Sequence, residues 1–570
     1  MGDCTRRDFL ATMALSAGLL PVAQAAGSRP NVIVILTDDQ GYGDAGVNGN
    51  DKIRTPNLDR FAEQGVRFSR FYCSPVCAPT RASLMTGRYY YRTGVIHTSR
   101  GGAKMHGDEV TLAELLGRAG YATGIFGKWH LGDNYPMRPQ DQGFAECLVH
   151  RAGGIGQAPD KPNSYFDPVL WHNGRRFKAD GYCTDAFTDA AMRFIESRRD
   201  QPFFVYLPLN APHTPLDIDA TYYEPYKALG LDDTTAKVYG MISNIDDNIG
   251  RLLARLDELG LRENTLIFFL GDNGPQQERY TAGLRGRKSS VYEGGIRVPC
   301  FAQWPKGFPG GRRIGRIAAH IDVAPTLLDA CGIEVPEGLA LDGASLMPLL
   351  RDPQTAWPDR RLFFQCHRGL TPKPYQNCAV MTGRYKMVGG PGTFKEDAYT
   401  APDKPVLELY DIDADPGEQH DLAKRHPEIL AKLRKEYDAW FVGVKRTRQF
   451  TPGVIHIGSD FENPSHLCRY QDSAYVDGKP TGWPVYIEKA GQYESTIDRG
   501  TSSVRAQMHV RLDGKRMMRP LDPNQNRAIF TLPEGDAMLD VWVQEENRPR
   551  VVHTKNDTTG DVTIKRLGVL

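Results

Sequence analysis

Pairs of polar residues closely follow two apolar segments of this 570-residue chain. Asp38 and Asp39 come after the run 32–36, and Asp272 and Asn273 come after the run 266–270. In an open α/β sheet, ligands bind where the carboxyl ends of the strands meet. Three carboxylates and an amide oxygen suit Ca²⁺ or Mg²⁺ better than a soft metal. Either pair alone is more often a cap or a turn, but both pairs at strand ends favour a metal site.

A second set of candidate residues lies in the segment 77–81, which reads C-A-P-T-R. A buried, inert cysteine is the commoner fate of such a residue. Here, however, Cys77 and Arg81 follow one acidic pair and precede several further blocks in a fixed order. These blocks are GKWHLG at 127–132, APHTP at 211–215, LRGRK at 284–288 and EGGIRVP at 293–299. In this combination and order, the chain resembles the type I sulfatases of the alkaline phosphatase superfamily.

The resemblance covers roughly residues 30–445 and implies a specific site. In that family the motif cysteine is oxidised to formylglycine, whose hydrate is the nucleophile, and Cys77 matches this cysteine. The implied catalytic residues are Cys77, Arg81, Lys128, His130, His213 and Lys288. The implied metal ligands are Asp38, Asp39, Cys77, Asp272 and Asn273. Ca²⁺ is the expected metal, with Mg²⁺ the less favoured choice, and Thr80 stands where serine is frequent in the family.

Physical chemistry gives reasons for these residue types. A sulfate monoester is a compact anion, so Lys128, Lys288 and Arg81 would supply fixed cationic donors. A hydrated aldehyde carries two hydroxyls, of which one can attack sulfur and the other can later expel sulfate. The second hydroxyl removes the need for a water molecule to hydrolyse the intermediate.

Acid and base roles follow as hypotheses. Asp272 is expected to help deprotonate the attacking hydroxyl, and His213, with Lys288, to protonate the departing alcohol oxygen. His130 is expected to take the proton from the second hydroxyl as sulfate leaves. A weaker set could face the leaving group or could equally be surface or packing residues: His97, Arg100, His172, His367 and Arg368.

Strand and helix patterns alternate through the first part of the chain, as expected for a mostly parallel sheet sandwiched by helices, alkaline phosphatase-like. Apolar runs predict strands at 31–36, 121–126, 203–207 and 266–270. Amphipathic spacing and caps predict helices at 55–65, 111–119, 184–197 and 242–256.

Four regions follow from the change of pattern along the chain. We expect a signal peptide at 1–26, a catalytic α/β domain at 27–355, an α+β subdomain at 356–445 with a helix near 427–441, and an accessory antiparallel β domain at 446–570, sandwich-like. The aromatic residues Trp483, Tyr486 and Trp542 are expected in the core of the last domain.

The first residues predict export. Arg6 and Arg7 precede a short apolar run and an A-x-A site at 23–25, which indicates a twin-arginine signal, or else an ordinary secretory signal. We therefore expect a bacterial protein in the periplasm or outside the cell. No later run approaches the roughly 20 apolar residues of a spanning helix, so no stable membrane span is expected.

Charge and cysteine content narrow the function further. With 70 Lys+Arg against 69 Asp+Glu, nothing global indicates nucleic-acid binding. The ten cysteines show no C-x-x-C spacing, so zinc is unsupported and disulfide pairing stays open.

The expected function is hydrolysis of a sulfate monoester, with a sulfated carbohydrate as the substrate suggested by family and export. A formylglycine-generating or sulfatase-maturating enzyme is then an obligatory partner. The alternatives are a phosphonate monoester or phosphodiester hydrolase of the same superfamily, and a non-catalytic carbohydrate-binding protein.

Overall fold

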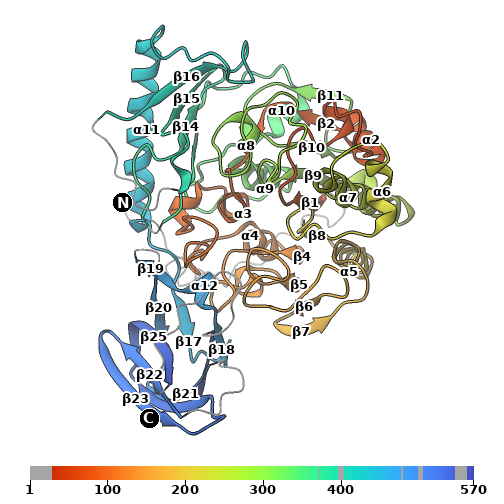
Figure 1. Ribbon diagram of the computed structural model, residues 1–570. Coiled ribbons are helices and arrows are strands. Elements are labelled where there is room, and N and C mark those ends of the chain that lie inside the picture. Colours follow the sequence, from red (N-terminus) through yellow and green to blue (C-terminus); the bar gives the residue numbers. More distant parts are fainter. Residues whose placement is uncertain are drawn as a thin grey trace.

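The computed structural model describes residues 29–369, 371–395, 404–476, 479–497, 505–545 and 561–569. The expected signal peptide at 1–26 lies outside these residues. Figure 1 shows a large α/β unit, a small sheet beside the long helix α11 (Pro427–Arg448), and a β domain at the C-terminal end of the chain.

A ten-stranded sheet forms the centre of the α/β unit within the described residues, in the order β11-β2-β10-β9-β1-β8-β4-β5-β6-β7. Its strands are β1 (Asn31–Thr37), β2 (Val66–Phe68), β4 (Ala122–Lys128), β5 (Glu146–His150), β6 (Val169–His172), β7 (Arg175–Lys178), β8 (Phe203–Pro208), β9 (Thr265–Gly271), β10 (Cys300–Gln303) and β11 (Arg312–Ile314). The central strands β9, β1, β8, β4 and β5 are parallel. Antiparallel strands flank them on both sides. The predicted mostly parallel sheet is confirmed.

Helices cover both faces of this sheet because its central strands are apolar on both sides. In β1, Val34 and Leu36 point to one core, whereas Ile33 and Ile35 point to the other. The first core is completed by α3 (Cys77–Thr86), α4 (Leu112–Arg118) and α9 (Val323–Ala330). The second is completed by α2 (Pro56–Gln64), α5 (Cys183–Ser197) and α7 (Asp233–Glu258). Shorter elements of the unit are α6 (Ala220–Lys227), α8 (Glu293–Ile296), α10 (Met347–Arg351) and the strand pair β3 (Phe71–Tyr72) and β12 (Ala318–Ala319).

An antiparallel sheet of four strands follows, formed by β13 (Leu362–Gln365), β14 (Cys378–Met381), β15 (Tyr385–Gly389) and β16 (Leu407–Asp411). Helix α11 packs against it and continues to Arg448, beyond the expected end near Phe441. Its buried side chains Leu433, Tyr437 and Trp440 recur at helical spacing and join the first core of the α/β unit. The small sheet is therefore packed onto the catalytic unit.

Two sheets form the C-terminal β domain in the described part of the chain. The larger contains β17 (Ile455–Ile457), β19 (Ala474–Val476), β20 (Lys479–Ile487), β22 (Ala506–Leu512), β23 (Lys515–Leu521) and β25 (Gly535–Glu545). The smaller contains β18 (Ser465–Leu467), β21 (Gly491–Ile497), β24 (Arg527–Leu532) and β26 (Val562–Val569). The pairing is antiparallel except between β17 and β20.

The core of the β domain contains one of the three expected aromatic residues. Trp483 is fully buried there, but the prediction is wrong for Tyr486 and Trp542, which are partly exposed. Neighbouring residues of a strand point to opposite faces, and Val485 and Val541 already take the inward positions. Trp542 stacks instead on His509 of the next strand, with 5.0 Å between ring centroids.

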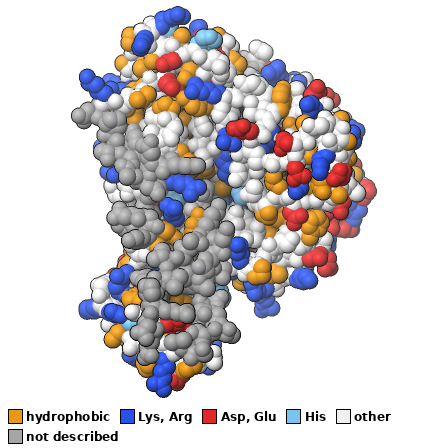
Figure 2. All heavy atoms as spheres, viewed as in Figure 1, with side chains coloured by type: hydrophobic (Ala, Val, Ile, Leu, Met, Phe, Trp, Pro, Cys, Tyr) orange, Lys and Arg blue, Asp and Glu red, His pale blue; other side chains and the backbone are white. Residues whose placement is uncertain are grey.

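None of the described helices has both the length and the apolar character needed to cross a membrane. Basic and acidic side chains are interspersed over the face seen in Figure 2. This agrees with the nearly balanced charge of the sequence.

Candidate active site

Adjacent parallel strands bring the two acidic pairs together. β1 and β9 pair in a register that places Thr37 opposite Gly271, so the residues that follow each strand lie at the same edge of the sheet. The Asp39 amide donates to Asp272 Oδ1 at 3.1 Å, and Asn273 Nδ2 donates to Asp39 Oδ1 at 2.7 Å. The four polar residues therefore form one connected cluster.

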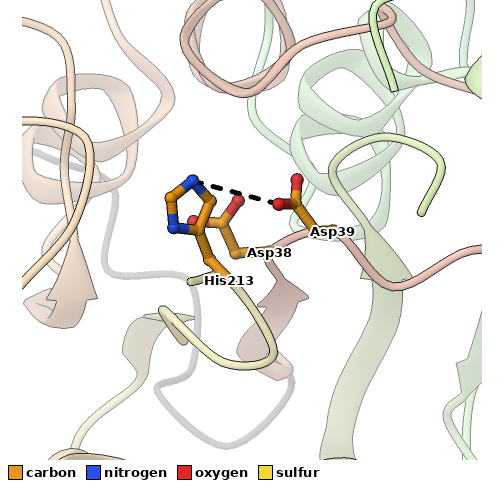
Figure 3. Close-up of side chains that lie close together, drawn as sticks. All are labelled: Asp38, Asp39 and His213. Carbon is orange, nitrogen blue, oxygen red and sulfur yellow. Dashed lines mark ion pairs between the residues drawn. The ribbon is translucent and has the colours of Figure 1, made fainter. Parts of the chain in front are cut away.

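Several oxygens of this cluster lack a hydrogen-bond donor. Among the described residues, Asp38 Oδ1, Asp39 Oδ2 and Asn273 Oδ1 are buried without a hydrogen-bond partner. His213 faces the same point, with its Nε2 atom 3.9 Å from Asp39 Oδ2 (Figure 3). Buried polar atoms are costly when they are unsatisfied. A hard divalent cation could coordinate these unpaired oxygens. The residues therefore fit such an ion.

Cys77 lies at the edge of this cluster, as the first residue of α3. Its Sγ atom lies within 4.8 Å of carboxylate oxygens of Asp38 and Asp272. The hydroxyl of Thr80 donates to the Asp272 carbonyl oxygen at 2.7 Å and so ties α3 to the end of β9. All residues of α3 are buried, which fixes the helix that presents Cys77.

Three cationic side chains approach the same carboxylates. Arg81 Nη2 lies 2.8 Å from Asp272 Oδ2, and Lys288 Nζ lies 2.6 Å from Asp39 Oδ1. Lys128, at the end of β4, donates through Nζ to Asp38 Oδ2. The three cationic side chains predicted to bind an anion thus surround the acidic cluster, and ion pairs with its carboxylates hold them there.

Burial and these charges determine the protonation states of the cluster. Burial raises the pKa of the Cys77 thiol, so the unmodified residue is a weak nucleophile. Burial, assisted by the charge of Asp38, raises the pKa of Asp272 to about 7. Burial would also raise the pKa of Asp38, but Lys128 and other cations outweigh it and hold that pKa well below its usual range. The pKa of His213 is lowered to about 4 by burial and by Lys288.

His130 contacts Cys77. Its Nδ1 atom lies 3.4 Å from Cys77 Sγ, and its Nε2 atom lies 2.9 Å from the carbonyl oxygen of Thr98. Burial, followed by the charge of Lys128, lowers the pKa of His130 well below its usual value, which favours a neutral ring. A neutral imidazole can accept a proton and is suited to act as a general base.

The sequence did not reveal two supporting groups. Thr98 contributes a backbone carbonyl, which no residue pattern can report. Arg279 donates from Nη2 to the carbonyl oxygen of Asp39 at 2.7 Å and pairs with Asp44 at 2.6 Å. Arg279 stands in no motif that distinguishes it from a surface arginine, although its side chain is fully buried.

The five weaker candidates have different surroundings. The guanidinium of Arg100 lies over the ring of Tyr475, and that of Arg368 over the ring of Phe394. His172 lies on β6 and pairs with Glu146 at 2.6 Å on the exposed side of the sheet, away from the cluster. His97 and His367 are buried beside one another, with ring centroids 6.4 Å apart. The nine cysteines within the described ranges form no disulfide with one another.

Comparison with known proteins identifies the class. A Sulfatase family model matches residues 30–333, and a model of the C-terminal region of N-sulphoglucosamine sulphohydrolase matches residues 287–440. The chain belongs to the sulfatase family of the alkaline phosphatase superfamily and is a sulfuric ester hydrolase.

Individual relatives agree with this assignment. The chain is 32% identical to human arylsulfatase A, over 74% of this chain and 89% of the relative. It is also 32% identical to mouse N-acetylgalactosamine-6-sulfatase, over 68% of this chain and 76% of the relative. Among solved structures, Ps i-CgsB in complex with k-i-k-neocarrahexaose superimposes with a TM-score of 0.64 at 29% identity, covering 72% of this chain and 93% of the other.

Proposed function

We propose that this sulfatase hydrolyses a sulfate monoester of a carbohydrate, using a formylglycine made from Cys77 and a bound Ca²⁺. One observation carries the proposal: Cys77 Sγ lies within 4.8 Å of buried carboxylate oxygens of Asp38 and Asp272, and 3.4 Å from Nδ1 of His130. An ordinary buried cysteine would not need two carboxylates and two lysines around it. The sulfur atom stands at the place of the oxygens that the modified residue would carry.

The metal would be held by Asp38, Asp39, Asp272, Asn273 and residue 77. Three of these residues offer buried oxygens that have no hydrogen-bond partner within the described chain. When bound, Ca²⁺ supplies positive charge that stabilises the anionic substrate and makes a hydroxyl of residue 77 more acidic. All the proposed protein ligands are oxygen donors after conversion of Cys77, which favours Ca²⁺ or Mg²⁺ over softer ions.

The remaining residues bind the sulfate and move protons. Arg81, Lys128 and Lys288 already point at the cluster and would contact the sulfate oxygens. His213 and Lys288 lie on the side of Asp39 and face the position of the departing alcohol oxygen. Lys288 would be the source of the proton, because its pKa is raised whereas the lowered pKa of His213 leaves that ring neutral. His130 would accept a proton at Nδ1 from residue 77, which it contacts.

Names of related proteins support the proposed substrate class, and the first residues of the chain support the proposed export. One relative is named for a sulfated amino sugar, and one related structure contains a neocarrahexaose. The arginine pair at 6–7 and the A-x-A site at 23–25 support export by the twin-arginine route to the periplasm or beyond. A formylglycine-generating or sulfatase-maturating enzyme is the required partner.

Turnover of a generic aryl sulfate tests the proposal. Protein made with a maturating enzyme should hydrolyse the substrate, lose activity when a chelator removes the metal, and recover with Ca²⁺. Cys77→Ala should lower kcat by at least about a thousandfold. Cys73→Ala is the matched control, because Cys73 is also buried but its Sγ donates to the Gly271 carbonyl oxygen and not to His130.

Two outcomes would count against the proposal. Faster turnover of an aryl phosphonate monoester than of the sulfate would favour the alternative hydrolase. Equal loss of activity in Cys73→Ala and Cys77→Ala would show that the variants act through packing.

A further inference from the structure

The segment 97–104, here called the clamp loop, lies between the active site and the C-terminal β domain. On the catalytic side, its Thr98 carbonyl oxygen accepts a hydrogen bond from His130 Nε2 at 2.9 Å. On the other side, it meets helix α12 (Arg469–Asp472), which lies at the junction of the two units (Figure 1).

The Thr98 carbonyl determines which nitrogen of His130 carries the proton. A carbonyl oxygen can only accept, so the Nε2 atom must be the one that bears hydrogen. A neutral imidazole has a single N–H, and Nδ1 therefore presents its lone pair. That lone pair faces Cys77 Sγ at 3.4 Å, the direction in which a general base has to point.

Helix α12 holds the clamp loop with several hydrogen bonds. Gln471 Nε2 donates to the same Thr98 carbonyl oxygen at 3.3 Å, and the Gln471 carbonyl oxygen accepts from the Gly101 amide at 2.8 Å. The Arg100 amide donates to the Tyr470 carbonyl oxygen at 3.1 Å.

A buried lysine adds a further bond to this contact. Lys104 Nζ donates to the Asp472 carbonyl oxygen at 2.9 Å, and the Lys104 and Gln471 side chains are both buried. Polar groups placed out of water in this way have a fixed position, because losing a partner costs free energy.

We infer that the β domain completes the active site, and that Gln471 is a positioning residue that holds Thr98 and, through it, the reactive tautomer of His130. The inference rests on the proposed role of His130 as the base. The residue comes from a region that neither matching family model covers, since the second model ends at residue 440. The β domain therefore assists the chemical step by positioning a residue of the catalytic unit.

The test compares Gln471→Met, which keeps the length of the side chain but removes the donor, with Gln471→Glu, whose carboxylate cannot donate to a carbonyl. Gln507→Met is the control, because Gln507 is an exposed residue on β22 of the same domain. Steady-state rates on an aryl sulfate are measured together with ¹⁵N NMR of ring-labelled histidine. The His130→Asn variant identifies the His130 signals.

Both Gln471 variants are expected to lower kcat about tenfold with little change in KM, since a displaced base slows chemistry more than binding. The wild-type His130 signals should report Nε2–H with a bare Nδ1, and the Gln471 variants should shift them toward a mixture of tautomers. Gln507→Met should change neither readout.

The inference is overturned if Gln471→Met and Gln471→Glu keep kcat within twofold and leave the His130 signals unchanged. It is also overturned if the wild-type ring carries its proton on Nδ1. Lack of wild-type activity on any sulfate ester would instead refute the proposed function, and the NMR comparison would still decide whether Gln471 positions His130.

Discussion

Single atoms show most clearly why this cluster suits a metal ion. Asn273 uses its amide nitrogen to donate to Asp39 and to the Gly274 carbonyl oxygen, which leaves its Oδ1 atom directed elsewhere and without a donor in the described structure. The amide is thereby oriented to present oxygen. A turn asparagine would have no need of this orientation.

Replacement of this oxygen should weaken metal binding. Asn273→Leu removes one neutral ligand and the hydrogen bond that orients Asp39, so we expect calcium affinity to fall about tenfold to a hundredfold. Calorimetric titration of the metal-free protein measures the change. Asn48→Leu is the control, because Asn48 also donates to a backbone carbonyl, that of Tyr42, but lies outside the cluster. Equal affinity in Asn273→Leu and wild type would remove Asn273 from the ligand set.

The sequence predicted the residue types of the site but not their connections. Asp38, Asp39, Asp272 and Asn273 could be found because acidic groups after buried strands are unusual. Arg279 and the Thr98 carbonyl could not be found, since the first has no motif and the second belongs to the backbone.

At the level of elements, strand ends place the catalytic groups. β4 ends with Lys128, and the chain then turns so that Lys128 and His130 both reach the cluster. The turn requires Gly127, whose φ is +136° and whose missing side chain leaves room for the Pro208 carbonyl oxygen at the end of β8. The close approach of β4 and β8 thus sets the position of Lys128.

A methyl group at this point should disturb the site. Gly127→Ala would overlap the Pro208 carbonyl and force an unfavourable φ, so we expect a loss of about 3 kcal/mol in unfolding free energy together with reduced kcat. Gly120→Ala separates the two causes: Gly120 also has a positive φ, of +88°, but has no atom within 4 Å of the added carbon. It should cost only about 1 kcal/mol and spare activity. Urea unfolding of both variants checks this, and equal losses would contradict the packing argument.

Local signals explain why these elements could be predicted. The strand β1 is apolar on both faces, and the helix α4 begins with a capping box in which Thr111 and Glu114 exchange hydrogen bonds. The predicted end of α11 was too early because Thr447 accepts a hydrogen bond from Arg92 and Arg448 pairs with Asp108 and Glu109. Such polar contacts leave little trace in the periodicity. The prediction placed Tyr486 and Trp542 in the core because they are aromatic. It did not take into account that neighbouring residues of a strand point to opposite faces.

Across the whole molecule, the small four-stranded sheet supports the loop that carries Lys288. Lys386 on β15 lies 3.1 Å from Glu293 and 2.8 Å from Glu418, and all three side chains are fully buried. The Glu293 amide also donates to Glu418 at 2.7 Å. A single lysine thus forms ion pairs with two buried carboxylates. Burial, together with the charge of Glu293, raises the pKa of Glu418 to about 7.

This arrangement predicts a pH dependence of stability. The folded protein keeps a proton on Glu418 up to about pH 7, whereas the unfolded chain releases it near the ordinary pKa of 4.5. Between these values the unfolded state binds fewer protons, so the free energy of unfolding falls as pH rises and levels off above pH 7. The loss at pH 8 relative to pH 5 is at most about 3 kcal/mol.

Glu418→Gln should remove this part of the slope, because an amide does not titrate. Unfolding midpoints of wild type and variant at pH 5 and pH 8 measure the difference. Glu428→Gln is the control, since Glu428 is exposed at the start of α11. A wild-type slope that persists unchanged in Glu418→Gln would show that Glu418 is already ionised in the folded protein.

The order of the motifs predicted the fold of the catalytic unit, but not how the β domain contacts it. Gln471 lies 373 residues from Thr98, and a hydrogen bond to a backbone carbonyl imposes no pattern on either segment. The part of the chain that seemed least informative about function contacts the Thr98 carbonyl oxygen, to which His130 donates.

The central claim concerns the chemical state of residue 77, and the mass of the tryptic peptide that carries it is the most direct test. In active protein made with a maturating enzyme, we predict a mass about 18 Da below that of the cysteine form, the change from a thiol to an aldehyde. An unmodified cysteine in a preparation that hydrolyses aryl sulfates would contradict the account, because the catalytic groups described here would then act on a different nucleophile.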